Sequence, residues 1–454
     1  MERIIETVRN FFRNYQLGIV FSLGVLLRVI VFLFQGPFNK DDHYAVVKYI
    51  YTHHALPHSL VVSQSDHPPL YYILASLLYP LGVKAVQAFS LGLSIGALYI
   101  FYLLIKRLDF IRPLKVKKYG LLLACTLPQL VMFGNYISND SLTFFIGACL
   151  FLQMFLYINA PTMSNLCILA IFLGVGLLTK GCFLAFVPIL IILIIIVQGA
   201  KKDGWRKCFL SVAIFFVIFS VLGSYKYIEN VVYFNRPSVL HIDQYQKWMK
   251  VQRPTYVGLE SIFDINLFKL MKEPIASPST WHSYPLLLYG TFWYQYIPES
   301  NFTMNMTGYK YLGSCIYLMA LLPTILFTAG FFRILFSFRN VFGYNNSDRL
   351  RFNETLYQIS SLGLFAVVLS GVFYLGIKYD VWSFFQSRYL FTTFFFIIIL
   401  FNSGINYLEE RWKGAGKIIF PWLNCLYFLF ILYFAVEIFR GFSFCSLGIS
   451  CHKP

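Results

Sequence analysis

The chain has 454 residues, of which 58% are hydrophobic, 19% are aromatic and only 13% are charged, and its formal net charge is +17. A water-soluble protein needs a larger share of charged residues to cover its surface, so this composition excludes a soluble enzyme or binding module. The basic residues occur in short clusters beside apolar runs, without a Lys/Arg-rich block. That pattern excludes nucleic acid as the expected partner and favours membrane lipids, including anionic ones.

Apolar runs of about 17–22 residues recur along the whole chain, the length that a helix needs to cross a hydrocarbon core of about 30 Å. No hydrophilic segment is long enough for a separate domain. We therefore expect an all-α polytopic membrane protein that forms a single domain, 1–454, with about eleven transmembrane helices. In chain order the expected spans are 17–34, 86–105, 120–136, 142–158, 165–178, 181–198, 208–223, 311–332, 356–377, 389–407 and 418–438.

The apolar run 69–82 is ambiguous because its length of about fourteen residues is short for a span and typical of an interfacial helix. If it does not cross and the N-terminus is cytoplasmic, the cytoplasmic side receives the N-terminal stretch and the loops 106–118, 199–207, 333–355 and 409–417, each with three or more Lys or Arg residues, as the positive-inside rule favours. If it crossed, the basic loops 106–118 and 199–207 would face outward. We therefore expect the N-terminus inside, the C-terminus outside, and the segment after Pro68-Pro69 on the outer surface.

Under this topology most distinctive polar residues collect on the outer side, in the long loops 35–85 and 224–310 and in short segments beside them. A transporter or lipid flippase, which is the alternative class, usually places ionisable residues near the middle of the membrane. Arg28 is the clearest charge inside an expected span. For Arg28 a structural role, such as snorkelling or one buried pair, and a functional role both remain open.

Several short motifs follow one another along the outer side. The first outer loop contains DDHY and DHPPLYY, followed in order by SNDSL (138–142), GVGLLTKGCFLAFVPI (174–189), LLYGTFWYQY (287–296) and QSRYLF (386–391). Together they resemble the GT-C glycosyltransferases, particularly the bacterial protein-mannosyltransferase-like (ArnT-like) branch of glycosyltransferase family 39. The resemblance covers 39–391. The chain departs from the family pattern at Asp41-Asp42, where Asp-Glu is usual, and at Thr392, where proline is usual.

The resemblance implies a GT-C fold with juxtamembrane helices in the first outer loop. It also implies transfer of a mannose-like hexose or a pentose from a polyprenyl-phosphate carrier to a lipid, glycan or protein acceptor, by inverting single displacement on the extracytoplasmic or lumenal side. No cofactor is expected. A divalent metal is the alternative, because related GT-C oligosaccharyltransferases use one and four histidines fall within 53–67, although their spacing defines no tetrahedral set. The departures also leave open a GT-C-like scaffold without activity.

An inverting displacement needs a base beside the acceptor hydroxyl, and a partly desolvated carboxylate can serve as one. Asp41 is the first candidate and Asp42 the second; the alternative is a solvated acid or a cap of the following helix. A leaving phosphate needs cationic donors. Arg388 is the first candidate for that role, followed by Lys180 and His67, and the alternative for Arg388 and Lys180 is a headgroup anchor.

Candidates for binding sugar or acceptor are Asp66, Asp140, Asn139, Tyr44, Tyr71, Trp293 and Gln386. The alternative role for Asp140 and Asn139 is to cap the fourth span, and for the aromatic residues it is to belong to the interfacial belt. The style of the motifs favours a bacterial inner membrane. The endoplasmic reticulum is the alternative, where the sequons at Asn301 and Asn305 would carry glycans.

Overall fold

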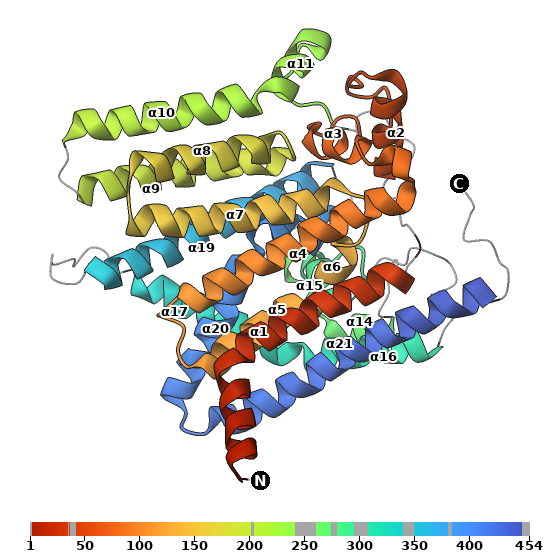
Figure 1. Cartoon of the computed structure of the whole chain (residues 1–454), viewed down its shortest axis with the longest axis vertical. Coiled ribbons are helices and arrows are strands. Elements are labelled where there is room, and N and C mark those ends of the chain that lie inside the picture. Colours follow the sequence, from red (N-terminus) through yellow and green to blue (C-terminus); the bar gives the residue numbers. More distant parts are fainter. Residues whose placement is uncertain are drawn as a thin grey trace.

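The computed structural model describes residues 2–34, 36, 42–200, 204–240, 260–273, 279–294, 307–338, 349–379 and 384–446. Within these ranges the regular elements are all helices. Figure 1 shows the long helices running side by side in one bundle, with the short helices α2, α3 and α11 gathered at one of its ends.

The helices have the following bounds: α1 Glu2–Phe34, α2 His43–His53, α3 Leu70–Ser76, η2 Tyr79–Leu81, α4 Val83–Arg107, α5 Leu114–Thr126, α6 Pro128–Phe133, α7 Asn139–Asn159, α8 Met163–Leu177, η3 Gly181–Ala185, α9 Phe186–Ala200, α10 Trp205–Gly223, α11 Tyr225–Phe234, α13 Glu260–Phe263, α14 Leu267–Lys272, α15 Tyr284–Trp293, α16 Thr307–Met319, α17 Leu321–Ser337, α19 Arg349–Tyr379, η7 Ser387–Thr393, α20 Phe394–Arg411 and α21 Ala415–Ser446.

In the described part of the chain, nine helical segments are long and apolar enough to cross a membrane. The protein is therefore a multi-pass integral membrane protein, as the sequence predicts. The expected count of eleven is not reproduced, because two expected spans are not single helices of that length. The run 120–136 is divided into α5 and α6, and α8 has only 15 residues.

The division between α5 and α6 has a cause in the sequence. Pro128 has no N–H to donate to the carbonyl of Ala124, so the helix cannot continue through it. The buried Arg28 of α1 supplies the missing donors: its guanidinium binds the carbonyls of Ala124 (2.9 Å) and Cys125 (3.1 Å), and the hydroxyl of Ser94 (3.0 Å). A cation is also favourable at the carbonyl end of a helix. Arg28 thus has a structural role in joining α1 to the end of α5.

Helix α20 forms the centre of the bundle. All its residues from Phe394 to Asn406 are buried, and α5, α17, α19 and α21 pack around it. The contact with α17 is close because glycines face it: a Cβ on Gly404 would collide with the carbonyl of Leu326, and one on Gly330 with the carbonyl of Leu400. Small residues allow such backbone contact between membrane helices. Helix α20 thereby gives η7, which directly precedes it, a rigid support.

Helix α3 has seven residues, Leu70–Ser76, which is too short to cross a membrane. Pro69 occupies the position before its first residue, where a missing N–H costs no helical hydrogen bond. The amide of Leu70 instead donates to the carbonyl of Leu178 at the end of α8 (3.0 Å). The segment 69–82 is therefore not one of the spans in the structure, in agreement with the charge asymmetry of the loops.

Candidate functional site

Three charged side chains from distant segments meet near the end of the bundle that carries α2 and α3. Asp140 lies in the first turn of α7, Lys180 precedes η3, and Arg388 lies in η7. The Lys180 ammonium donates a short hydrogen bond to one carboxylate oxygen of Asp140, and Arg388 Nη1 lies 3.6 Å from the other. We call these three residues the ion cluster. All of them are largely shielded from solvent.

The ion cluster has an excess of positive charge, since two cations share one carboxylate. Burial by itself lowers the pKa of Lys180, but the adjacent Asp140 carboxylate outweighs that effect and raises the pKa above its ordinary value. The amine is therefore charged at neutral pH. A buried group of net charge +1 attracts an anion more strongly than the same charges would in water.

Aromatic rings surround the two cations. The guanidinium of Arg388 lies 5.2 Å from the ring centres of both Phe133 and Tyr389, and it donates to the Tyr389 hydroxyl (3.3 Å). The ammonium of Lys180 also lies 5.2 Å from the Tyr389 ring. These cation–π contacts hold the charged groups in place without neutralising them. The sequence analysis did not select Phe133 or Tyr389. Tyr389 belongs to the QSRYLF motif, and that position in the motif could have indicated it.

The first outer loop is brought against the ion cluster. The imidazole of His43 hydrogen-bonds the hydroxyl of Tyr72 (2.7 Å), stacks on the ring of His67 with 5.9 Å between ring centres, and interacts electrostatically with Asp140. The hydroxyl of Tyr71 hydrogen-bonds that of Ser90 (2.8 Å). His43, Tyr71 and Tyr72 are buried. The motifs DDHY and DHPPLYY therefore lie together, and their His43 and Tyr72 are site residues that sequence reasoning left out.

Several predicted residues lie in or beside the ion cluster. Asp140, Lys180 and Arg388 form it. Asn139 precedes Asp140 and donates to the carbonyl of Thr179 (3.5 Å), while Gln386 is buried at the residue before η7. Neither Asn139 nor Asp140 caps α7. The N-cap is Ser138, whose hydroxyl accepts from the Asp140 amide (3.2 Å), because Ser138 has the extended backbone that a cap requires.

The acidic candidates of the first outer loop differ in position. Asp41 lies outside the described residues. Asp42 is exposed and occupies the N-cap position of α2 with a left-handed backbone (φ 62°), and its side chain makes no capping hydrogen bond. Asp66 is buried next to His67. Asp42 belongs to the DDHY motif and lies directly before α2, whereas Asp66 belongs to the DHPPLYY motif and lies at the turn before α3. Both motifs approach the ion cluster.

Two predicted aromatic residues lie elsewhere. Tyr44 stacks on Tyr79, with 5.6 Å between ring centres, and Trp293 is buried against Phe327 while its indole N–H donates to the hydroxyl of Thr324 (3.2 Å). Their partners lie in η2 and α17, two elements that contribute no residue to the ion cluster. Burial against apolar helices explains the position of Trp293, because most of its surface is apolar.

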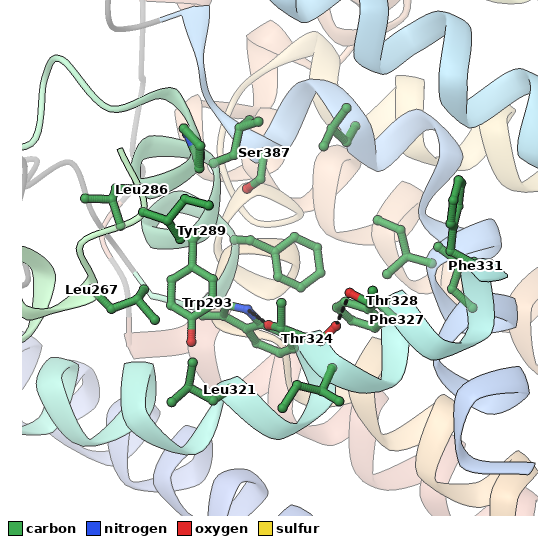
Figure 2. A pocket seen from close by; sticks show the side chains of 18 of the residues that line it. Leu267, Leu286, Tyr289, Trp293, Leu321, Thr324, Phe327, Thr328, Phe331 and Ser387 are labelled. Carbon is green, nitrogen blue, oxygen red and sulfur yellow. Dashed lines mark hydrogen bonds between the residues drawn. The ribbon is translucent and has the colours of Figure 1, made fainter. Parts of the chain in front are cut away.

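An apolar cavity of about 720 Å³ lies beside η7, whose Ser387 and Leu390 line it. Its walls come from α14, α15, α17, α19, α20 and η7. Figure 2 shows Tyr289, Trp293 and Thr324 around it, with Ser387 at its edge. Ser387 is joined to Thr291 of α15 by two hydrogen bonds (2.9 and 2.7 Å). Successive residues of η7 thus serve two sites: Ser387 lines the cavity and Arg388 belongs to the ion cluster.

The four histidines of 53–67 do not come together. His53 and His54 are exposed at the end of α2, His58 hydrogen-bonds Glu229 of α11 (3.0 Å), and His67 stacks on His43. Among the residues that the structure describes, no three His, Cys, Asp or Glu side chains are grouped as a possible metal site.

No protein-family model matches the sequence, and no curated protein matches it. The structure is similar to that of ArnT from Cupriavidus metallidurans bound to undecaprenyl phosphate, with 13% identity, coverage of 88% of this chain and 79% of ArnT, and a TM-score of 0.38. It is also similar to the oligosaccharyltransferase AglB from Archaeoglobus fulgidus in complex with an inhibitory peptide and a dolichol-phosphate (12% identity, 95% and 56% coverage, TM-score 0.45).

The apo form of the Archaeoglobus fulgidus oligosaccharyltransferase matches with 13% identity and a TM-score of 0.48 over the same shares of the two chains. The chain spans little more than half the length of that oligosaccharyltransferase. The motif resemblance names the ArnT-like branch of the GT-C glycosyltransferases, and the similarity to ArnT and to the oligosaccharyltransferase is one of fold.

Proposed function

We propose that the chain is a glycosyltransferase that moves a sugar from a polyprenyl-phosphate carrier to an acceptor at the outer surface of its membrane. The observation that carries this proposal is the convergence of the sequence motifs on one site. The ion cluster joins SNDSL, the Lys180 segment and QSRYLF. The amide of Leu70 and the imidazole of His43 attach the two motifs of the first outer loop, and Thr291 attaches LLYGTFWYQY.

In the proposed reaction, Lys180 and Arg388 bind the phosphate of the carrier and stabilise the charge that develops as the sugar leaves. An arginine can give two hydrogen bonds to one phosphate, and the shielded site strengthens both interactions. Lys180 is held by Asp140, and Arg388 by Tyr389 as well. Because both cations are already in place, no reorganisation is needed when the anion binds.

The base that accepts the proton of the acceptor hydroxyl is proposed to be Asp41, with Asp42 as the second candidate. Asp140 is unsuitable for that role, since its two cationic neighbours stabilise the ionised carboxylate and make it a weak proton acceptor. We assign Asp140 to positioning Lys180 and Arg388. Asp42 directly precedes His43, so the acidic pair starts the segment that packs against Tyr72.

The apolar cavity beside η7 suits the isoprenoid chain of such a carrier. Its lining is almost entirely aliphatic and aromatic, and its volume of about 720 Å³ is in the range of ligand sites. Ser387, which lines the cavity, and Arg388, which belongs to the ion cluster, are adjacent in the chain. A transporter would use a charged residue within the spans. The candidate for that role, Arg28, binds backbone carbonyls instead, so the transporter alternative has little support.

The test is transfer from radiolabelled polyprenyl-phosphate sugars by the purified protein in nanodiscs, with identification of the labelled product. Arg388→Ala and Lys180→Met should each lower the rate by about 10²-fold, the usual loss when one donor to a developing anion is removed. Lys48→Met is the matched control, because Lys48 is exposed on α2 outside the ion cluster; it should keep the rate.

Asp41→Asn should abolish turnover while leaving donor binding intact, because a base acts on the acceptor and not on the carrier phosphate. If Asp41→Asn and Asp42→Asn both left transfer unchanged, the assignment of the base would be wrong. If the wild-type protein transferred none of the sugars offered, the proposed function would be wrong.

The bacterial inner membrane remains the proposed location. Asn301 and Asn305, whose glycosylation would indicate the endoplasmic reticulum, lie outside the described residues. Sugar and acceptor identity also follow only from the product of the transfer experiment.

A further inference from the structure

Helix α11, Tyr225–Phe234, is amphipathic, but it buries its polar face and exposes its apolar face, the reverse of a helix on a water-facing surface. Its polar residues, Lys226, Glu229 and Asn230, are buried, whereas Ile228 and Val232 are 58% and 68% exposed. The other exposed residues of α11 are Tyr225, Val231 and Tyr233. A helix facing water would present charged or amide side chains there, so this apolar face needs a partner.

The polar face of α11 is used within the protein. Lys226 and Glu229 form a close ion pair, and Glu229 also accepts a hydrogen bond from the imidazole of His58 (3.0 Å). The hydroxyl of Ser59 donates to the side chain of Asn230 (2.7 Å). These bonds attach α11 to the first outer loop. They leave α11 without a charged or amide side chain on its exposed face.

The exposed apolar face continues the lipid-facing surface of α10. Val217 and Val221 of α10 are exposed within a span, and Tyr225, Ile228 and Val232 follow at intervals of three or four residues. Only Ser224 separates the two helices; it keeps a helical backbone, and its carbonyl accepts from the Ile228 amide (3.0 Å). The stripe therefore passes through the bend in register, while α11 leaves the end of α10 at an angle (Figure 1).

We propose that the exposed face of α11 lies on the outer leaflet of the membrane, at the boundary between headgroups and acyl chains, and that its partner is phospholipid. An amphipathic helix binds in that position through its apolar face. Tyr225 and Tyr233 sit near its two ends, as in the aromatic belt of membrane proteins. Through His58 and Ser59, α11 then anchors the first outer loop to the membrane surface. This inference does not depend on the proposed reaction.

The test places a photoreactive benzoylphenylalanine at Val232 in the full chain, in nanodiscs that contain fluorescent phosphatidylcholine. The matched controls are Val221, on the lipid-facing side of α10, and His54, exposed at the end of α2. The probe at Val232 should form a lipid adduct in a yield near that at Val221 and several times that at His54. A yield as low as at His54 would overturn the proposal. A protein adduct of twice the chain mass instead would show that a second copy is the partner.

A second variant separates contact from chance proximity. With the probe at Ile228, Val232→Glu should lower the lipid labelling several-fold, because a carboxylate resists entry into the acyl region. Val232→Leu keeps the apolar face and should leave the labelling unchanged. Since Val232 is exposed, neither change disturbs the folded core. Equal labelling in both variants would contradict a membrane-bound face.

Discussion

Asp140 is the residue on which the ion cluster depends. A carboxylate this deeply shielded is expensive to bury, and the nearby ammonium and guanidinium offset that cost. The reverse also holds, since Lys180 and Arg388 would repel each other without Asp140 between them. The cluster therefore has to be treated as one unit, in which the loss of any member changes the energy of the other two.

We predict that Asp140→Asn lowers the free energy of unfolding by about 3 kcal/mol, because it leaves two buried cations without a counter-charge. The double variant Asp140→Asn/Lys180→Met should be less destabilised than the sum of the two single changes, since it removes one cation with the carboxylate. Thermal unfolding in nanodiscs measures both, with the exposed Lys48→Met as control. Additive losses would show that Asp140 and Lys180 are not energetically coupled.

The pH dependence of this pair has a definite sign. The folded state raises the pKa of Lys180, so its contribution to stability is fully present below the ordinary value of 10.5 and is lost as the pH rises through the folded-state pKa. Deprotonation of Lys180 therefore does not weaken the ion cluster at neutral pH.

At the level of elements, α17 and α20 form a close pair, and η7 runs directly into α20. The two helices approach so closely that backbone carbonyls occupy the space in which the side chains of Gly330 and Gly404 would lie. A similar backbone contact joins η7 to α7, where a Cβ on Gly147 would collide with the carbonyl of Thr392. Close backbone packing thus holds α20 against α17 and η7 against α7, the helix that carries Asp140.

We predict that Gly404→Ala lowers the thermal midpoint in nanodiscs, because the added methyl group forces α17 and α20 apart. Gly371→Ala is the matched control: Gly371 also lies in a spanning helix, α19, but a methyl group there meets open space. That change should be neutral or stabilising by about 0.4–1 kcal/mol. Equal midpoints for the two variants would contradict the close contact of α17 with α20.

For the whole molecule, the motifs, α2, α3 and α11 share one end of the bundle, and we place that end outside the membrane from the charge of the loops. A single-cysteine accessibility experiment checks this orientation. His54→Cys should react with an impermeant maleimide in intact cells, whereas Asp109→Cys, exposed in a loop expected to be cytoplasmic, should react only after permeabilisation. The wild-type chain reports the background of native cysteines, and the reverse labelling pattern would invert the topology.

Local properties of the sequence were sufficient to predict the class of protein, most of the spans and the short helix after Pro68-Pro69. Length of an apolar run, position of proline and distribution of charge act over a few residues, and the bilayer converts them directly into structure. The same local information selected Asp140, Lys180 and Arg388 one by one, from motifs that resemble a known family.

Only the tertiary structure decided which of these residues meet. Lys180 and Asp140 are separated by 40 positions in the sequence, and hydrophobic periodicity does not say which inward-facing side chains become neighbours. For the same reason, the contact of His43 with Tyr72 and the place of Trp293 beside an apolar cavity could not be read from the sequence. Spans follow from the solvent that surrounds each segment, whereas a site follows from contacts between segments.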